Sequence, residues 1–340
     1  MAHTPFTSIP LIDIAGLASS DLAERQRVAA ELGRAAREVG FLQIVGHGLS
    51  AELRAGLIEQ AQRFFARPLE EKLRFYIGQS SNHSGYVPEG EERFAGGSRD
   101  LKEAYDVNYD YTEGPQRYPL LGPTLWPDDP AFREAVGAYY RAALALGERL
   151  FRGFALALGL AEDTFAAVTR HPTSQLRLIH YPLDPDPQAD RPGIGAHTDY
   201  ECFTLLLPTA PGLQVRNGEG DWIEVPLIAD ALVVNIGDML EVLSNGQFLA
   251  TAHRVRKVSE ERYAFPLFCA CDYPTRIAPL PGLPAREGRH YEPVVCGDHL
   301  FAQTAQTFAY LQRRLAEGSL TLPDGSLGLA SFGPGQEVPA

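Results

Sequence analysis

The 340-residue chain has few cysteines, and none of them forms a recognisable motif. The four are Cys202, Cys269, Cys271 and Cys296, with no C-x-x-C pair and no Cys/His finger spacing. Cys269 and Cys271 flank one residue in an apolar segment, so we expect them to share a strand face. We expect buried, reduced thiols of a cytoplasmic protein, and a metal or redox role is the alternative.

Three other absences narrow the class of protein. The net charge is -13, the pI is about 5.2 and no basic block occurs, which argues against nucleic acid or anionic membrane as a partner. No run of 18 apolar residues occurs, and the first residues lack the basic and apolar regions of a secretory signal. We therefore expect a cytoplasmic protein with no membrane or nucleic-acid partner, and the sequence leaves the oligomeric state open.

Helix and strand signals alternate over the first half of the chain. Hydrophobic periodicity and capping residues predict a strand over 9–14, helices over 21–39 and after Ser50, a strand over 41–45 and a long helix over 129–159. Ser20 suits the N-cap of the first helix, and Gly40 suits its C-terminal cap. Pro68 is expected to begin a short helix. Residues 77–130 are expected to form loops over the entrance of a site, with short strands near 103–109.

The pattern changes after Pro172 to short β-type runs separated by turn signals. The runs are 176–181, 203–207, 213–215, 222–225, 232–236 and 263–269, and a final helix is expected over 298–317. Regular short strands with turns favour a sandwich or jelly roll. With no repeat and no separating linker, the chain is expected to form one catalytic unit, a helical N-terminal part packed around a β-core.

The most informative residues are His197, Asp199 and the distant His253. Residues i and i+2 of a strand point to the same face, so His197 and Asp199 would lie side by side. Two imidazoles and one carboxylate capping one side of a metal are typical of non-haem Fe(II) oxygenases, because the opposite coordination positions stay open for co-substrate and O2. A polar strand residue and a core histidine are the alternative reading of the two histidines.

An ordered set of motifs resembles the isopenicillin N synthase-like family of Fe(II)/2-oxoglutarate-dependent oxygenases over roughly residues 8–312. The matching segments are Ile9–Asp13, Gly40–Gly48, Gly195–Asp199, Gly212–Val215, Trp222, Leu232–Asp238, Ser244–Gly246, His253–Val255 and Arg262–Tyr263. The resemblance implies an α+β fold, a double-stranded β-helix (jelly-roll) core with flanking helices. It also implies Fe(II), 2-oxoglutarate and O2 as cofactor and co-substrates, with His197, Asp199 and His253 as iron ligands.

On this basis we divide the chain into four regions. They are an N-terminal helical and mixed region over 8–125, a long helix and connection over 126–171, the jelly-roll core over 172–275, and a C-terminal segment and helix over 276–330. The resemblance implies hydroxylation of a small-molecule metabolite, or its desaturation or cyclisation, as in secondary metabolism. Decarboxylation of 2-oxoglutarate supplies two of the four electrons that reduce O2, and the substrate supplies the other two.

Arg262 resembles the family arginine that pairs with the distal carboxylate of 2-oxoglutarate, and Tyr181 resembles the tyrosine that hydrogen-bonds the same group. An arginine fork suits a carboxylate and stays charged. A surface ion pair with Glu260 or Glu261 is the alternative for Arg262, and a core aromatic is the alternative for Tyr181. The family usually has Arg-x-Ser, whereas Ala264 stands here, which removes one hydrogen bond worth about 0.5–1.5 kcal/mol.

Substrate contacts are expected from Arg177, Tyr200 and Glu92. Arg177 shares a predicted strand face with Tyr181 and matches an arginine that holds a substrate carboxylate in several family members. A salt-bridged scaffold arginine and a solvated loop carboxylate are the alternatives for Arg177 and Glu92. For Asn235, a structural amide is favoured over a co-substrate contact. Both an amino-acid-like carboxylate and a flavonoid-like aromatic remain open as substrates.

Three rival functions remain open at this stage. Ala264 favours the first of them, a 2-oxoglutarate-independent oxidase of the isopenicillin N synthase type. The second is ethylene-forming fragmentation of 2-oxoglutarate, and residues 84–92, 193–197 and Ala264 resemble the ethylene-forming branch of the family. Against it, the final helix carries Gln303, Gln306 and Gln312 where we would expect an arginine for the substrate site of that branch. A non-enzymatic zinc binder would be favoured by loss of a triad residue, and none is lost.

Overall fold

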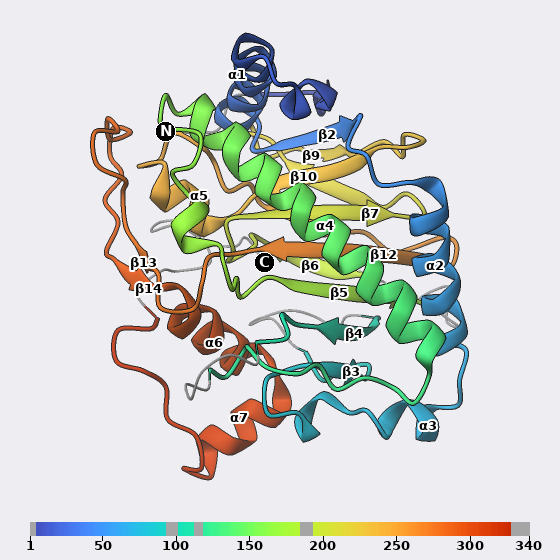
Figure 1. The fold of residues 1–340 in the computed structure, drawn as a ribbon. Helices are drawn as coiled ribbons and strands as arrows, with labels where there is room; N and C mark the ends of the chain where they lie inside the picture. Colours follow the sequence, from blue (N-terminus) through green and yellow to red (C-terminus); the bar gives the residue numbers. More distant parts are fainter. Residues whose placement is uncertain (1–4, 93–100, 112–117, 184–192, 328–340) are drawn as a thin grey trace.

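The fold is built from two β-sheets and the helices that cover them (Figure 1). A computed structural model describes residues 5–92, 101–111, 118–183 and 193–327. The eight-stranded sheet has the order β1-β2-β10-β7-β12-β5-β4-β3, and the four-stranded sheet has the order β6-β11-β8-β9. Together they form the jelly-roll core, so the fold class expected from the sequence is confirmed.

The strands of the large sheet come from both halves of the chain. Its members are β1 (Leu11–Asp13), β2 (Phe41–Val45), β3 (Gly85–Val87), β4 (Glu103–Val107), β5 (Gln175–Tyr181), β7 (Phe203–Pro208), β10 (Leu232–Ile236) and β12 (Arg262–Cys269). Only the β1–β2 pair is parallel among these described pairings. Central strands such as β7 and β10 read as apolar runs because both of their faces are covered.

The smaller sheet consists of β6 (Ile194–His197), β8 (Leu213–Arg216), β9 (Trp222–Glu224) and β11 (His253–Val255). β6 and β11 were not among the strands predicted from the sequence, because they lack an apolar run or a clear alternation. A two-stranded sheet, β13 (Arg276–Ile277) with β14 (Val294–Val295), lies near the C-terminal helices. β6 and β11 carry the candidate metal ligands, so the smaller sheet positions the site.

Seven α-helices lie within the described ranges. They are α1 (Leu22–Glu38), α2 (Ala51–Phe65), α3 (Leu69–Leu73), α4 (Pro130–Ala157), α5 (Asp238–Leu243), α6 (Cys296–Thr307) and α7 (Ala309–Ala316). Of these, α1, α2 and α4 begin at residues whose side chains cap them. Asp21, not Ser20, caps α1, because its carboxylate accepts from Ala23 N. Ser50 caps α2 as predicted, and Gly40 ends α1 with a φ of 72°. Within the described ranges, no helix combines the length and apolar composition needed to cross a bilayer.

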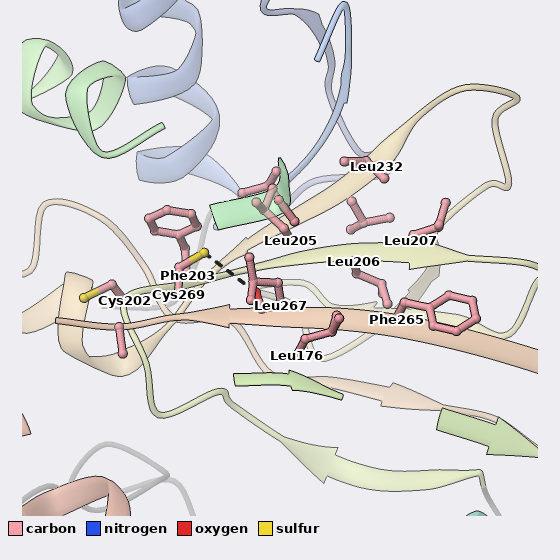
Figure 2. Packing of buried hydrophobic residues seen from close by; sticks show 14 of the residues in the cluster. Leu176, Cys202, Phe203, Leu205, Leu206, Leu207, Leu232, Phe265, Leu267 and Cys269 are labelled. Atoms are coloured by element: carbon pink, nitrogen blue, oxygen red, sulfur yellow. Dashed lines mark hydrogen bonds between the residues drawn. The ribbon is translucent and has the colours of Figure 1, made fainter. Parts of the chain in front are cut away.

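The main core lies between α4 and the large sheet. α4 crosses one face of the sheet, with α1 and α2 packed against it (Figure 1). Figure 2 shows side chains of β5, β7, β10 and β12 meeting in this core, among them Phe203, Leu205 and Leu267. Cys202, Cys269, Cys271 and Cys296 are all buried as free thiols, as expected. This packing makes the sheet a rigid support for the residues at its edge.

The final helix is broken, contrary to the single helix expected over 298–317. Phe308 is extended, with φ −94° and ψ 124°, and it forms an antiparallel bridge with Glu92. Glu91 supplies the reason, because its backbone oxygen accepts from Ala309 N and its carboxylate accepts from Tyr310 N. These contacts cap the start of α7 from a distant loop, which no local pattern could indicate.

Candidate metal and co-substrate site

Three metal-binding side chains converge at one end of the smaller sheet. His197 ends β6, Asp199 lies in the loop beyond it, and His253 begins β11, where it is the register partner of His197. One ligand atom from each residue lies within 4.8 Å of the other two. Asp199 is not on the strand, so the loop and the pairing with β11, rather than a shared strand face, bring the three together. The side chains are placed to hold one ion.

Backbone carbonyls fix the two imidazole rings. The Nδ1 of His197 donates to Gly195 O across 2.8 Å, and the Nδ1 of His253 donates to Thr251 O across 3.3 Å. Each Nε2 then points at Asp199 Oδ1, at 3.6 Å in both cases. A ring whose Nδ1 holds the proton offers the lone pair of Nε2, which is the tautomer a metal ligand needs.

The carboxylate is fixed by two strands of the large sheet. Asn235 donates to Asp199 Oδ2 across 2.7 Å, and the hydroxyl of Thr204 donates to the same oxygen. Thr204 and Asn235 are register partners on β7 and β10. This leaves Oδ1 for the histidines and an ion between them. Asn235 is thus the structural amide favoured from the sequence, and Thr204 is a supporting residue that the sequence analysis missed.

The protonation states suit a divalent metal. Burial lowers the pKa of His197 to about 4, and the neighbouring His253 adds to the effect. Burial alone would raise the pKa of Asp199, but His253 and His197 hold it below its usual value. A neutral His197 beside an ionised Asp199 is the state in which these two ligands bind a metal. The donor set therefore fits Fe(II) chemically.

Arg262 and Tyr181 lie together at the ends of two interior strands of the large sheet. They are register partners on β12 and β5, with the guanidinium carbon 4.8 Å from the ring centroid. Arg262 is 1% exposed, its Nε donates to Ala210 O, and its Nη1 has no hydrogen-bond partner in the described part of the chain. Burial lowers its pKa. A buried cation with an unsatisfied donor fits an incoming carboxylate, and it is not the surface ion pair considered as the alternative.

A cleft of about 90 Å³ opens beside the triad and receives side chains from both halves of the chain. It is lined by His83, Glu92, Lys102, Gln175, Arg177, Ile179, Ile194, His197, Thr198, Asp199, Tyr200, Glu201, Phe268, Thr304, Thr307 and Phe308. The three predicted substrate residues, Arg177, Tyr200 and Glu92, are all among them, whereas Arg262 and Tyr181 are not. A larger hollow of about 540 Å³ near α1 and α4 holds no triad residue, so size alone does not identify the site.

Arg177 is held in a buried charge network. Its Nε and Nη2 donate to the two carboxylate oxygens of Asp106 across 2.7 and 2.9 Å, and its Nη1 donates to Glu92 across 3.0 Å. Lys102 Nζ lies 2.7 Å from the other oxygen of Glu92. Burial would raise the pKa of Glu92, yet Arg177 and Lys102 hold it well below its usual value. Glu92 is therefore not a solvated loop charge.

Two further titratable side chains of the cleft were not indicated by the sequence. Burial, with a smaller contribution from Asp199, raises the pKa of Glu201 to about 8. Burial, with Arg177 nearby, lowers the pKa of His83 to about 3, and His83 Nδ1 lies 2.7 Å from the hydroxyl of Tyr310. No motif singles out either residue, because only the fold brings positions 83 and 201 to the same cleft.

Comparisons with known proteins identify two matching families and several relatives of similar length. Residues 9–129 match the family described as non-haem dioxygenase in morphine synthesis N-terminal, and residues 172–270 match the 2OG-Fe(II) oxygenase superfamily. A homoarginine-6-hydroxylase of Arabidopsis thaliana, 2-ODD-C23.2, is 34% identical over 329 residues, covering 91% of each chain. The 2-oxoglutarate-dependent dioxygenase tropC of Talaromyces stipitatus is 32% identical, covering 81% of this chain and 90% of tropC.

Solved structures with the same fold include enzymes bound to the co-substrate. Neurospora crassa T7H in complex with alpha-KG superposes with a TM-score of 0.76 at 25% identity, covering 90% of this chain and 100% of T7H. A putative 2OG-Fe(II) oxygenase family protein of Caulobacter crescentus gives a TM-score of 0.75 at 29% identity, covering 92% and 99% of the two chains. The likeness spans nearly the whole of each molecule.

Proposed function

Because the chain belongs to the 2OG-Fe(II) oxygenase superfamily, we propose specific roles for its site residues. His197, Asp199 and His253 hold Fe(II), and Arg262 with Tyr181 holds the distal carboxylate of 2-oxoglutarate. The protein is a 2-oxoglutarate-dependent non-haem iron dioxygenase that couples decarboxylation of 2-oxoglutarate to hydroxylation of a small molecule. The observation that supports the metal assignment is the 4.8 Å cluster of His, Asp and His ligand atoms.

The bound iron supplies the chemistry by using O2 and 2-oxoglutarate to oxidise a C–H bond, and the protein supplies position and protonation state. Gly195 O and Thr251 O hold the imidazole protons on Nδ1, so both Nε2 atoms are free to bind. Thr204 and Asn235 keep one oxygen of Asp199 occupied. Arg262 neutralises one end of the co-substrate inside a buried setting, where a charge-assisted pair is strong.

The rival reactions are not favoured. The relatives found are 2-oxoglutarate-dependent enzymes, and several solved neighbours contain 2-oxoglutarate. Ala264 occupies a buried strand position opposite Ile179 and Pro208, where it removes a hydroxyl without disturbing the pairing of β12. The unpaired Nη1 of Arg262 is available to a carboxylate whether or not that hydroxyl is present.

For the prime substrate we favour a small, polar, amino-acid-like metabolite over a flavonoid-like aromatic. The 34%-identical relative is named as a hydroxylase of homoarginine, and the cleft is lined by Arg177, Glu92, Lys102 and Glu201 as well as by Tyr200. A large aromatic substrate would place an apolar surface against this charged lining and offer it no polar partner. A cytoplasmic location is part of the proposal, supported by four cysteines buried as free thiols.

The test is anaerobic addition of 2-oxoglutarate to the Fe(II)-loaded protein, followed in the visible spectrum. A weak metal-to-ligand charge-transfer band is expected for the wild type, because a keto acid that chelates Fe(II) gives this colour. The Arg262→Gln variant should need a higher 2-oxoglutarate concentration to reach the same band, and His253→Ala should give none. Absence of the band in wild-type protein with iron demonstrably bound would contradict the proposal.

A further inference from the structure

Glu201 is presented to the cleft by a loop whose backbone is held tightly. It lies in the turn between β6 and β7, two residues beyond Asp199. Its carbonyl oxygen accepts from Met239 N across 3.1 Å, and a Cβ added to Gly237 would come within 2.3 Å of that oxygen. The glycine therefore allows the close approach that fixes this turn. The position of Glu201 beside the metal ligand is set by the fold, not by its own side chain.

The other charges around the cleft compensate one another. Asp106 pairs with Arg177, Arg177 with Glu92, and Glu92 with Lys102, and the side chains of all four are at most 9% exposed. Two cations and two anions give this network no net formal charge. Bound Fe(II), Asp199, doubly charged 2-oxoglutarate and Arg262 together would also be formally neutral.

Glu201 is left without a compensating charge. Within the described ranges no lysine, arginine or histidine forms an ion pair with it, although it is partly buried and lines the same cleft. Its neighbour Asp199 is of the same sign. The backbone N–H groups of Tyr200 and Glu201 donate to its carboxylate, but a carboxylate removed from water stays costly unless a cation also meets it. An ionised Glu201 therefore leaves the loaded site one positive charge short of neutral, on the wall that faces the substrate.

We infer that Glu201 binds a positively charged nitrogen group of the substrate, so that the cleft selects ammonium- or guanidinium-bearing metabolites. The inference rests on the proposed function, because it assumes that the cleft beside the triad receives the substrate. Glu92 is a weaker candidate for this role, since Arg177 and Lys102 already occupy its carboxylate. A neutral donor on the substrate would hydrogen-bond Glu201 but would leave its charge uncompensated.

The experiment uses two matched pairs of probes that differ in charge but little in shape. L-Arginine is compared with L-citrulline, and L-lysine with Nε-acetyl-L-lysine, by calorimetric titration of the anaerobic Fe(II) protein saturated with 2-oxoglutarate. The cationic member of at least one pair should bind about tenfold or more tightly than its neutral partner, because hydrogen bonds to charged groups are worth about 1.5–3 kcal/mol.

Two variants assign the preference to Glu201. Glu201→Gln should reduce it to about threefold or less, and Glu201→Asp, which keeps the charge, should retain part of it. Glu162→Gln, which removes a carboxylate from a distant ion pair with Arg25, should leave it unchanged. Circular dichroism of each variant establishes that it is folded.

The outcomes separate this inference from the proposed function. A full preference in Glu201→Gln, equal or tighter binding of the neutral probes by wild type, or no binding of either cationic probe at millimolar concentration would each overturn the role of Glu201. In all three cases the 2-oxoglutarate charge-transfer band would still be present. Loss of that band in iron-loaded wild type would instead overturn the proposed function.

Discussion

Asn235 and Thr204, which face each other across β10 and β7, donate to the same oxygen of Asp199. This pair ties a metal ligand in the loop after β6 to the centre of the large sheet. Both side chains are 2% exposed, so water cannot easily replace their hydrogen bonds. The geometry of the candidate metal site is therefore a property of the jelly-roll core as well as of the three ligands.

Removal of the Asn235 amide is expected to weaken iron binding without abolishing it. In the Asn235→Ala variant Asp199 keeps the hydroxyl of Thr204 but loses a charge-assisted hydrogen bond, and such supporting contacts are worth about 10–100-fold in metal affinity. Fe(II) affinity is measured anaerobically by competition with a chelator. Asn217→Ala, which removes a buried amide bonded to Phe6 O instead, is the control, and a comparable loss in that variant would contradict the assignment.

Loss of one imidazole should have a larger effect than loss of the supporting amide. We expect His253→Ala to abolish iron binding and turnover while the protein stays soluble, because a ligand is lost outright but the ring contacts only the rings of His197 and Phe41 among the described aromatic pairs. Iron content after desalting is the measurement. His290→Ala removes an exposed histidine and should retain the wild-type iron content. Tight iron retention by His253→Ala would refute the triad.

Arg262 is expected to matter more for co-substrate binding than for folding. Its Nη1 has no described partner and burial lowers its pKa, so Arg262→Gln removes a buried charge that is already poorly satisfied. Stability without ligand should change little, whereas the stabilisation by 2-oxoglutarate, about 2.7 kcal/mol at 100 times Kd, should be lost at the same concentration.

Thermal unfolding of the Arg262→Gln protein with and without 2-oxoglutarate measures this difference. Arg37→Gln serves as the matched control, because Arg37 also donates to a backbone carbonyl, that of Ala157, but lies far along the sequence from β12. An undiminished shift of the melting temperature in Arg262→Gln would remove Arg262 from the co-substrate site.

The features that could be predicted from the sequence are those that depend on neighbouring residues in the chain. Strands 41–45 and 232–236 were predicted with the bounds that the structure has, because their apolar runs are flanked by turn residues. The metal triad was identified from residue types and from the resemblance, although β6 and β11 themselves were not predicted. Their sequences, Ile-Gly-Ala-His and His-Arg-Val, lack the apolar run or alternation by which other short strands were predicted.

The features that were missed depend on contacts between distant positions. Asp106 lies 71 residues before Arg177, and no spacing rule joins them. The break at Phe308 exists because Glu91 and Glu92 reach it from a loop more than 200 residues earlier. In each case the tertiary fold supplies the partner.

Arg177 should be needed for stability whatever its role toward substrate. Arg177→Gln leaves Asp106, which is 0% exposed, and Glu92 as buried carboxylates with one cation fewer, a change that costs about 3–5 kcal/mol in comparable sites. Urea unfolding at neutral pH measures the loss. The double variant Arg177→Leu with Asp106→Leu should recover part of it, and a single variant as stable as wild type would contradict the network.

His83 gives the folded protein a specific sensitivity to acid. Its folded pKa is about 3, because burial and the nearby Arg177 oppose protonation, while Glu92 partly offsets them and Tyr310 bonds its Nδ1. The pKa of a histidine in the unfolded chain is about 6.5. Between about pH 6.5 and pH 3, therefore, the unfolded chain binds a proton that the folded protein does not bind, and stability is lost as the pH falls. His83 alone should account for about 2 kcal/mol of destabilisation between pH 7 and pH 5.

Urea unfolding of wild type and His83→Gln at both pH values measures this. The variant should be less stable at pH 7, having lost the bond to Tyr310, but its stability should fall less on acidification. The exposed His290→Gln should follow wild type, and equal pH slopes for wild type and His83→Gln would show that His83 is not the group responsible.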